Sequence, residues 1–268
     1  MATSTPNNDR FNAEAAAWDS NPDVRAASAS ALQALLAAQP PVLQSDKGDG
    51  DKSPGPGPDV LEIGCGTGLL TLLVAPHARR IVAIDAAGGM IDALKLKLDG
   101  EAGAGASSLR GAIHPLNILL TDPEDPRLPP GRDDGQQQRL KFDLVISHLT
   151  LHHIPDADLR PLLATMHGCL RPGGQIALTD FEDFGPEARR FHPEAKMVGV
   201  ERHGIRAEWF AGLMREAGFE DVDVGVAWTM EKEVERFPGE WGSERPQGGA
   251  DLAKMDFPFL LCRGTRKS

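Results

Sequence analysis

The amino-acid sequence predicts an α/β protein whose core is a mainly parallel β-sheet. Short apolar runs alternate with segments of helical period through most of the 268 residues. The first run, residues 60–63, ends in glycines, which suits a buried parallel strand that turns into a helix. The last two apolar runs have no evident helix between them, which predicts an antiparallel pair at one edge of the sheet.

The individual elements follow from the spacing of apolar residues. The predicted strands are apolar runs of four to six residues, at 60–63, 80–84, 117–121, 142–147, 175–179, 222–226 and 258–262. Alanine- and leucine-rich segments of helical period predict helices at residues 12–38, 69–77, 90–98, 156–170 and 208–217. An Arg-Pro-Gly-Gly turn closes the fourth of these helices, and Gly218 closes the fifth.

Polar stretches divide the chain into parts. Residues 1–43 are expected to form an N-terminal tail, mobile over 1–10, followed by a helix. Residues 44–58 contain a Pro-Gly-Pro-Gly-Pro run that neither a helix nor a central strand accommodates, which predicts a flexible linker. The main domain is then expected over residues 59–268. Flexible or polar loops are expected at 100–111, 123–141 and 238–251.

Composition narrows the possible functions. The formal net charge of −11 argues against a nucleic-acid coat protein, which usually presents a basic face. No apolar run approaches the roughly 20 residues of a membrane helix, and the N-terminus lacks the order of a signal peptide, so no membrane role is expected. The three cysteines form no Cys-x-x-Cys pair, which argues against a zinc knuckle and favours a reducing cytoplasmic or nuclear setting.

A glycine loop and an acidic residue mark the candidate ligand site. Residues 62–68 read Glu-Ile-Gly-Cys-Gly-Thr-Gly, between the first strand and the following helix. Glycines let a ligand approach the backbone, and the helix N-terminus offers free N–H groups. Asp85 ends the second strand, where its carboxylate can accept hydrogen bonds from both hydroxyls of a ribose.

The spacing of the glycines separates classes of nucleotide-binding protein. Dinucleotide-binding folds favour Gly-x-Gly-x-x-Gly, but Leu69 occupies the third glycine position here. A nicotinamide-dependent oxidoreductase is therefore disfavoured. No Gly-Lys-Ser/Thr sequence follows, which excludes a phosphate-binding P-loop.

Several motifs in order resemble class I S-adenosylmethionine (SAM)-dependent methyltransferases. Residues 60–68 resemble the first motif of that family, and Ala83-Ile84-Asp85 with Met90 resembles the second. Residues 142–154 resemble the fourth-strand motif of the branch with ubiquinone/menaquinone-biosynthesis and type 11 methyltransferases, and residues 170–174 the turn before the fifth strand. Shorter matches to a small-molecule subgroup extend the resemblance over roughly residues 11–262, at 11, 17–19, 191–192, 203–204 and 217–219.

The resemblance implies a fold, a cofactor and a set of contacts. The fold is a Rossmann-like seven-stranded, mostly parallel sheet with an antiparallel edge strand and helices on both faces. The cofactor is SAM, which becomes S-adenosylhomocysteine. Glu62 and the glycine loop would hold the methionine and ribose part, Asp85 the ribose diol, and Met90 would pack near adenine. The implied cofactor-binding residues are Trp18, Glu62, Gly64, Cys65, Gly66, Gly68, Asp85, Ala86, Met90, Asp122 and Ser147.

Three histidines are candidate catalytic residues. His148 follows the fourth strand, which in this fold faces the methyl group, and an imidazole there could accept a proton from a hydroxyl or amine acceptor. The alternative is a loop histidine bonded to a backbone carbonyl. His192 and His203 lie within a cap-like insertion around residues 181–206, which could line an acceptor pocket, and Trp18 could belong to a lid over the cofactor.

His152 and His153 raise the question of a metal site together with His148. Histidines four residues apart can share a helical face, but no carboxylate pair or cysteine lies nearby in the sequence. On the resemblance, the His-His pair is structural. The sequence therefore predicts no metal.

The predicted function is methyl transfer from SAM to a small-molecule acceptor, at an oxygen, nitrogen or carbon atom, by in-line displacement. SAM carries an electrophilic methyl group, so alignment and desolvation would supply most of the catalysis. The alternatives are a protein or RNA methyltransferase and a non-catalytic SAM-fold binding protein. The sequence does not determine the acceptor or the oligomeric state.

Overall fold

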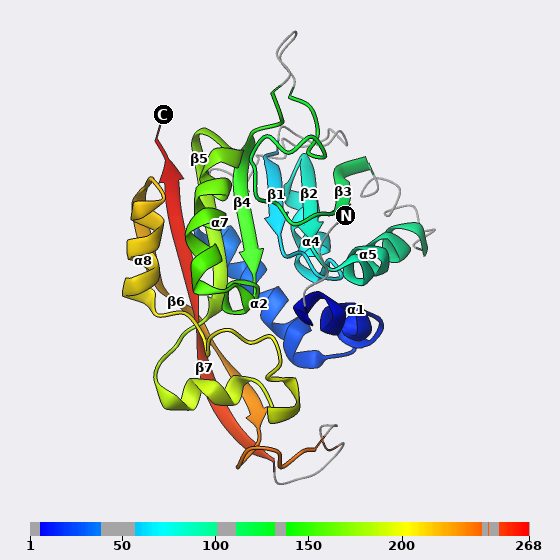
Figure 1. Ribbon diagram of the computed structural model, residues 1–268, viewed down its shortest axis with the longest axis vertical. Helices are drawn as coiled ribbons and strands as arrows, with labels where there is room; N and C mark the ends of the chain where they lie inside the picture. The colour runs from blue at the N-terminus through cyan, green and yellow to red at the C-terminus, as the bar shows by residue number, and fades with distance from the viewer. Residues whose placement is uncertain are drawn as a thin grey trace, which may run out of the picture.

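The computed structural model describes residues 6–38, 57–100, 111–131, 138–242, 246 and 252–267. Within these residues, seven strands form a single sheet in the order β3-β2-β1-β4-β5-β7-β6 (Figure 1). The predicted seven-stranded α/β sheet is therefore confirmed. The strands are β1 (Asp59–Ile63), β2 (Arg80–Asp85), β3 (Ile113–Asn117), β4 (Phe142–His148), β5 (Leu170–Phe181), β6 (Phe219–Val234) and β7 (Ala253–Arg266).

Strand pairing matches the predicted mostly parallel sheet. The strands from β3 to β5 pair in parallel, with Val60 opposite Ile81 on β2 and Leu144 on β4. β7 runs antiparallel to both of its neighbours, β5 and β6. The predicted antiparallel pairing at one edge is confirmed, and the reversed strand lies one position inside that edge.

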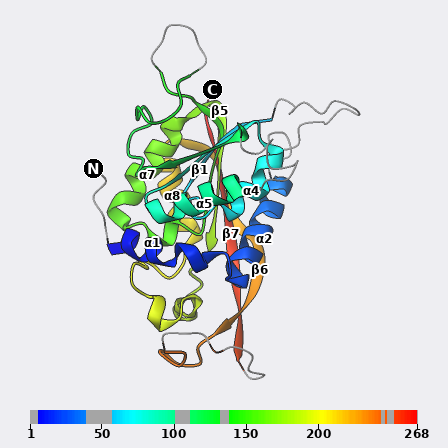
Figure 2. The same ribbon diagram turned by 90° about the vertical axis from the view of Figure 1, so that its right-hand side faces the viewer.

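Helices cover both faces of the sheet, because successive residues of a buried strand point to opposite sides. Val60 packs in the apolar cluster that contains α2, α4 and α5 residues, whereas the next residue, Leu61, packs in the cluster beneath α7 and α8. Figures 1 and 2 show the sheet between these two layers. In the described residues, these two layers contain α2 (Pro22–Ala38), α4 (Leu69–Val74), α5 (Gly88–Gly100), α7 (Asp156–Cys169) and α8 (Ala207–Glu216).

The N-terminal region differs from its prediction. In place of one helix over 12–38, the chain forms α1 (Pro6–Trp18) and α2, so residues 6–10 are helical rather than a tail. The hydroxyl of Ser20 donates to the Ala17 carbonyl at 2.6 Å and helps to end α1. Pro22 then begins α2, since a proline needs no N–H partner in the first turn of a helix. Alanines recur at helical spacing on both sides of the break between α1 and α2, so the sequence pattern did not indicate that break.

The third strand also differs from its prediction. β3 spans Ile113–Asn117, whereas the prediction placed it at 117–121. Ile118 and Leu120 are buried, but they follow the strand and lie at its carboxyl end. The apolar run at 117–121 therefore signals burial and not strand conformation.

β6 and β7 are much longer than predicted, with 16 and 14 residues, and extend beyond the sheet as a two-stranded ribbon (Figure 1). Phe257 and Phe259 of this ribbon pack against Phe181 and Phe191 in a separate apolar cluster. That cluster supports residues 182–206, which contain the short 3₁₀ helices η3 (Pro186–Phe191) and η4 (Glu194–Lys196). Most of the predicted linker at 44–58 and of the loops at 100–111 and 238–251 lies outside the described residues.

Cys65, Cys169 and Cys262 are buried and free. Among the helices of the described ranges, none has the length and apolar character needed to cross a membrane.

The glycine loop after β1 is held against the end of β2. The backbone N–H groups of Gly64 and Cys65 both donate to the carbonyl of Ile84, at 2.9 and 3.0 Å. Gly64 has a φ of 72°, in the region that favours glycine. A Cβ atom at this position would lie 2.3 Å from Oγ1 of Thr150. Both the backbone and the space around it therefore require glycine at position 64.

We expect Gly64→Ala to lower the free energy of unfolding by about 2–4 kcal/mol, because it combines a left-handed backbone with a steric clash. Gly100→Ala is the matched control: no atom lies within 4 Å of a Cβ at that helical position. The control should change stability by less than about 1 kcal/mol. Urea denaturation measures both effects, and equal stabilities of the two variants would contradict the assignment of strain to Gly64.

Candidate active site

A cavity of about 620 Å³ lies at the carboxyl ends of the central strands. Its walls come from the glycine loop after β1, the end of β2, residues 118–121 after β3 and the turn that follows β4. α1 supplies a further wall through Phe11 and Trp18. Ligands of open α/β sheets bind at this edge, where neighbouring loops diverge.

Most of the residues that the sequence predicted for the cofactor line this cavity. They share a location at the carboxyl edge of the sheet or on α1. This group comprises Trp18, Glu62, Gly64, Cys65, Gly66, Asp85, Ala86 and Met90, and the candidate catalytic residue His148 lines the same cavity.

Three other predicted cofactor residues are not among those that line the cavity. Gly68 lets α4 approach α5, since a Cβ there would lie 2.4 Å from Leu94 Cδ1. The hydroxyl of Ser147 donates to the Ile63 carbonyl at 2.7 Å and connects β4 to β1. Asp122 is exposed and accepts the Glu124 N–H at 2.8 Å, within a turn. The structure thus gives these three residues local structural contacts.

Asp85 joins two parts of the site. One carboxylate oxygen accepts the N–H of Gly66 at 2.9 Å, and the other accepts the N–H of Ala87 at 2.8 Å, before α5. Burial raises the pKa of Asp85, and the two N–H donors oppose that shift. The carboxylate is therefore held in one orientation at the cavity wall.

Glu62 is almost fully buried beside Asp85, with 1% of its surface exposed. The hydroxyl of Thr71 donates to its Oε2 at 2.6 Å. Burial raises the pKa of Glu62 to about 8, and the nearby Asp85 carboxylate adds to the shift. In the absence of ligand the side chain is therefore mostly neutral at pH 7, and a cationic ligand in the cavity would favour its ionised form.

His148 is the last residue of β4, and its Nδ1 lies 2.8 Å from Thr179 Oγ1. Burial lowers the pKa of this imidazole to about 4, so it is neutral at pH 7. Its Nε2 atom is buried and has no hydrogen-bond partner among the described residues. The next residue, Leu149, has a φ of 52°, so the backbone is strained where the chain turns past the cavity.

α1 connects three parts of the site across its open side. Asn12 accepts the N–H of Gly89 at 2.8 Å, next to α5. Immediately after the helix, Asp19 accepts the hydroxyl of Thr67 from the glycine loop at 2.5 Å. Arg10 donates to the carbonyl of Val198 at 2.6 Å, in the 182–206 segment. Figure 1 shows α1 across the carboxyl ends of the central strands, next to that segment.

Two predicted catalytic residues lie outside the cavity, and several residues that line it were not predicted. His192 and His203 lie outside the cavity lining, so the structure does not bring the three candidate catalytic histidines together. Sequence reasoning missed Phe11 and His153 as lining residues, as well as residues 118–121. The apolar run at 118–121 was the available signal, but its period suits a strand equally well.

Comparison with known proteins agrees with this geometry. A family model described as a methyltransferase domain matches residues 25–224. An uncharacterized methyltransferase of Schizosaccharomyces pombe is 26% identical over 193 residues, which cover 67% of this chain and 61% of that protein. Malonyl-[acyl-carrier protein] O-methyltransferase of Serratia marcescens is 31% identical over 137 residues, or 50% of this chain and 44% of that protein. The matches thus span less than two thirds of these curated relatives.

A solved structure shares the fold. It is described as that of a putative methyltransferase from Bacillus halodurans C-125 and gives a TM-score of 0.55 at 15% identity, covering 80% of this chain and 94% of that one. Together, the fold and the family match assign the chain to the class I SAM-dependent methyltransferases. The chain belongs to the methyltransferase-domain family, since the family model matches well over half of its residues. The prediction that the cofactor is SAM is therefore confirmed.

Glu62→Gln is expected to reduce the pH dependence of stability. A carboxyl group with a folded pKa of about 8, above its ordinary 4.5, keeps a proton that the unfolded chain has already released. The contribution of Glu62 to stability is therefore fully present below the unfolded pKa and is lost as pH rises towards 8, by about 1.4 kcal/mol per pH unit. Glutamine keeps an acceptor for Thr71 but does not titrate.

Urea denaturation of the ligand-free wild type and variant between about pH 5.5 and 7.5 isolates this contribution, because the other titrating groups are common to both proteins. We expect the difference in stability between them to change steadily with pH. Parallel stability curves would show that Glu62 does not hold a proton in the folded state.

Proposed function

We propose that the protein transfers the methyl group of SAM to a small-molecule acceptor, at an oxygen, nitrogen or carbon atom. One observation supports this above others: a single cavity of about 620 Å³ is lined by the glycine loop and Asp85 and also by His148 and α1. This volume is within the range of about 300–1,000 Å³ typical of small-molecule sites. Its position beneath α1 favours an acceptor that enters the protein over one that remains part of a macromolecular surface.

In this proposal, the cofactor lies along the glycine loop. Gly66 leaves its backbone accessible, since a Cβ atom there would meet nothing within 4 Å. Asp85 would accept hydrogen bonds from the ribose hydroxyls. The buried carboxyl group of Glu62 and the half-buried one of Asp85 would lie near a ligand that carries a sulfonium and an ammonium, and binding would favour the ionised form of Glu62.

α1 and the 182–206 segment would act as lid and cap. Phe11 and Trp18 pack edge to face, with ring centroids 5.8 Å apart, and both line the cavity. Gly199 and Glu201 contribute the wall from the 182–206 segment. Enclosure of this kind excludes water and holds donor and acceptor in line, which is where the rate enhancement of methyl transfer would arise.

His148 would orient the acceptor. The hydroxyl of Thr179 reaches the Ser147 carbonyl at 3.5 Å, and when it donates there, Nδ1 of His148 donates to Thr179 and leaves a lone pair on Nε2. That lone pair can accept a hydrogen bond from a hydroxyl or amine. A pKa of about 4 makes the imidazole a weak base, so alignment is its main contribution. His192 and His203 receive no role in the transfer step.

We expect Asp85→Ala to weaken SAM binding by about 1.5–3 kcal/mol, through loss of charge-assisted hydrogen bonds to the ribose. This is roughly a 10–150-fold rise in Kd. Isothermal titration calorimetry with SAM, S-adenosylhomocysteine and NADH should show wild-type binding of the first two ligands only. Asp92→Ala, at an exposed position of α5, is the matched control and should bind like the wild type.

Two results would count against this assignment. An unchanged affinity in the Asp85→Ala variant would remove Asp85 from the cofactor site. Wild-type protein that is folded and free of bound cofactor, yet binds neither sulfur ligand, would reduce the proposal to a fold assignment and favour the non-catalytic alternative.

The acceptor class is tested with methyl-labelled SAM and a fractionated cell extract. We expect label to enter the low-molecular-weight filtrate, and to do so after protease and nuclease treatment of the extract. His148→Asn should lower this transfer by about 10²–10⁴-fold if His148 both orients and deprotonates the acceptor, and less if it only orients it, with SAM affinity nearly unchanged. Label confined to protein or RNA would replace the small-molecule proposal, and full activity of the variant would exclude His148.

A further inference from the structure

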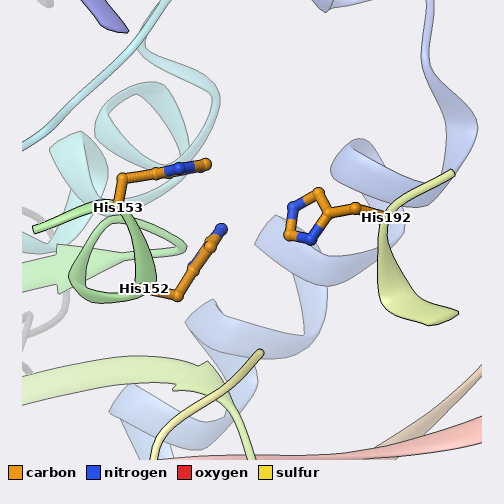
Figure 3. A group of neighbouring side chains, drawn as sticks. All are labelled: His152, His153 and His192. Atoms are coloured by element: carbon orange, nitrogen blue, oxygen red, sulfur yellow. The ribbon is translucent and has the colours of Figure 1, made fainter. Parts of the chain in front are cut away.

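Three histidine side chains meet beside the cavity. His152 and His153 end the 3₁₀ helix η2 (Leu151–His153), and His192 directly follows η3. One potential ligand atom from each residue lies within 4.8 Å of the other two. In Figure 3 the His152 and His153 rings extend from the same turn towards the facing ring of His192. The sequence predicted no metal. That prediction rested on His152 and His153 taken together with His148, which does not belong to the group of three found here.

Each histidine of the adjacent pair already has one ring nitrogen engaged. Nδ1 of His152 lies 2.8 and 3.0 Å from the two carboxylate oxygens of Asp180, which is fully buried. Nδ1 of His153 lies 2.7 Å from the carbonyl of Gly199. A ring nitrogen that faces an acceptor carries a proton, which leaves Nε2 as the nitrogen of each ring that could bind a metal. Metal-binding histidines are oriented in this way by a carboxylate or a carbonyl.

Two of the remaining ring nitrogens lack a hydrogen-bond partner within the part of the chain that the structure describes. Nε2 of His152 and Nδ1 of His192 are buried, and neither has a hydrogen-bond partner among the described residues. Buried polar atoms of this kind are rare in folded proteins.

Nearby cations are held by other groups. Arg10 bonds to Glu14 at 3.2 Å and to a backbone carbonyl, and Lys232 pairs with Asp23 at 3.4 Å. Asp180 places a carboxylate directly behind His152. A bound cation would therefore have an anionic group next to one of its ligands.

We propose that His152, His153 and His192 bind one divalent transition-metal ion, with zinc as the first candidate because imidazole nitrogens suit it well. Tetrahedral coordination needs nitrogen atoms about 3.3 Å apart, so the ligand atoms, which lie within 4.8 Å of one another, must approach by at most about 1.5 Å. Three protein ligands leave a position for water or an acceptor atom, as in catalytic rather than structural zinc sites. His153 also lines the cavity, so the ion would lie next to it. This inference goes beyond the proposed methyl transfer and does not rest on it.

The test uses the full chain without a histidine tag, treated with a chelator and then titrated with Zn²⁺ or Co²⁺. We expect about one ion per chain, and a visible Co²⁺ absorption spectrum typical of four- or five-coordinate imidazole-bound metal. Wild-type protein that retains less than half an equivalent of either ion after gel filtration would overturn the proposal.

Variants assign the ion to the cluster. His192→Ala should weaken metal binding by more than about 100-fold, and Asp180→Asn by about 10–100-fold through the orientation of His152. His114→Ala is the matched control, since His114 is exposed on β3 and should leave binding unchanged. Metal binding by His192→Ala that equals the wild type would overturn the site.

Folding of each variant is checked independently of the metal. His192 does not line the cavity, so His192→Ala should bind SAM like the wild type and melt at a metal-independent temperature. A failure of SAM binding in the wild type would affect the proposed function alone, whereas a failure of metal binding would affect this inference alone.

Discussion

The site depends on how the chain leaves β1. The backbone turns back so that the Ile84 carbonyl accepts two N–H groups of the glycine loop, while the Asp85 carboxylate accepts a third from Gly66. This reversal needs a positive φ at Gly64, Gly66 and Gly68, which glycine adopts at little cost. Because the loop is fixed to the end of β2, the ligand-facing groups of both strands stand in one wall. Every other element of the cavity is placed around that wall.

Burial then sets the chemistry of the wall. Glu62, Asp85 and His148 all lie where water is largely excluded, and desolvation is the leading cause of the pKa shift in each. Burial favours the neutral form of each group. A cationic cofactor in the cavity would instead stabilise the ionised form of the two carboxyl groups. A low-dielectric pocket of this kind also strengthens the interactions of a sulfonium with nearby carboxylates. In the proposed function, cofactor recognition and the desolvation useful for methyl transfer would therefore both arise from the burial of this wall.

The side of the cavity proposed for the acceptor is built from segments that are distant in the sequence. α1, the turn after β4 and the 182–206 segment meet through contacts such as Arg10 with the Val198 carbonyl and His153 with the Gly199 carbonyl. The same convergence brings His192 to the His152–His153 pair, supported from below by Phe181 and Phe191. The β6–β7 ribbon carries the apolar cluster beneath them. The part of the molecule that differs most from a minimal α/β sheet is thus the part that shapes this end of the cavity.

The sequence by itself determined the sheet, the order of its strands along the chain, the glycine loop and Asp85, because period, turn chemistry and motif spacing are local properties. It did not distinguish a strand from a buried loop at Ile118, nor reveal the break before Pro22, because an apolar run reports burial and not backbone conformation. Only the tertiary structure decided that Ser147 bonds inside the sheet, that α1 lies over the cavity and that three histidines converge. These outcomes depend on packing between residues far apart in the chain, which no local pattern encodes.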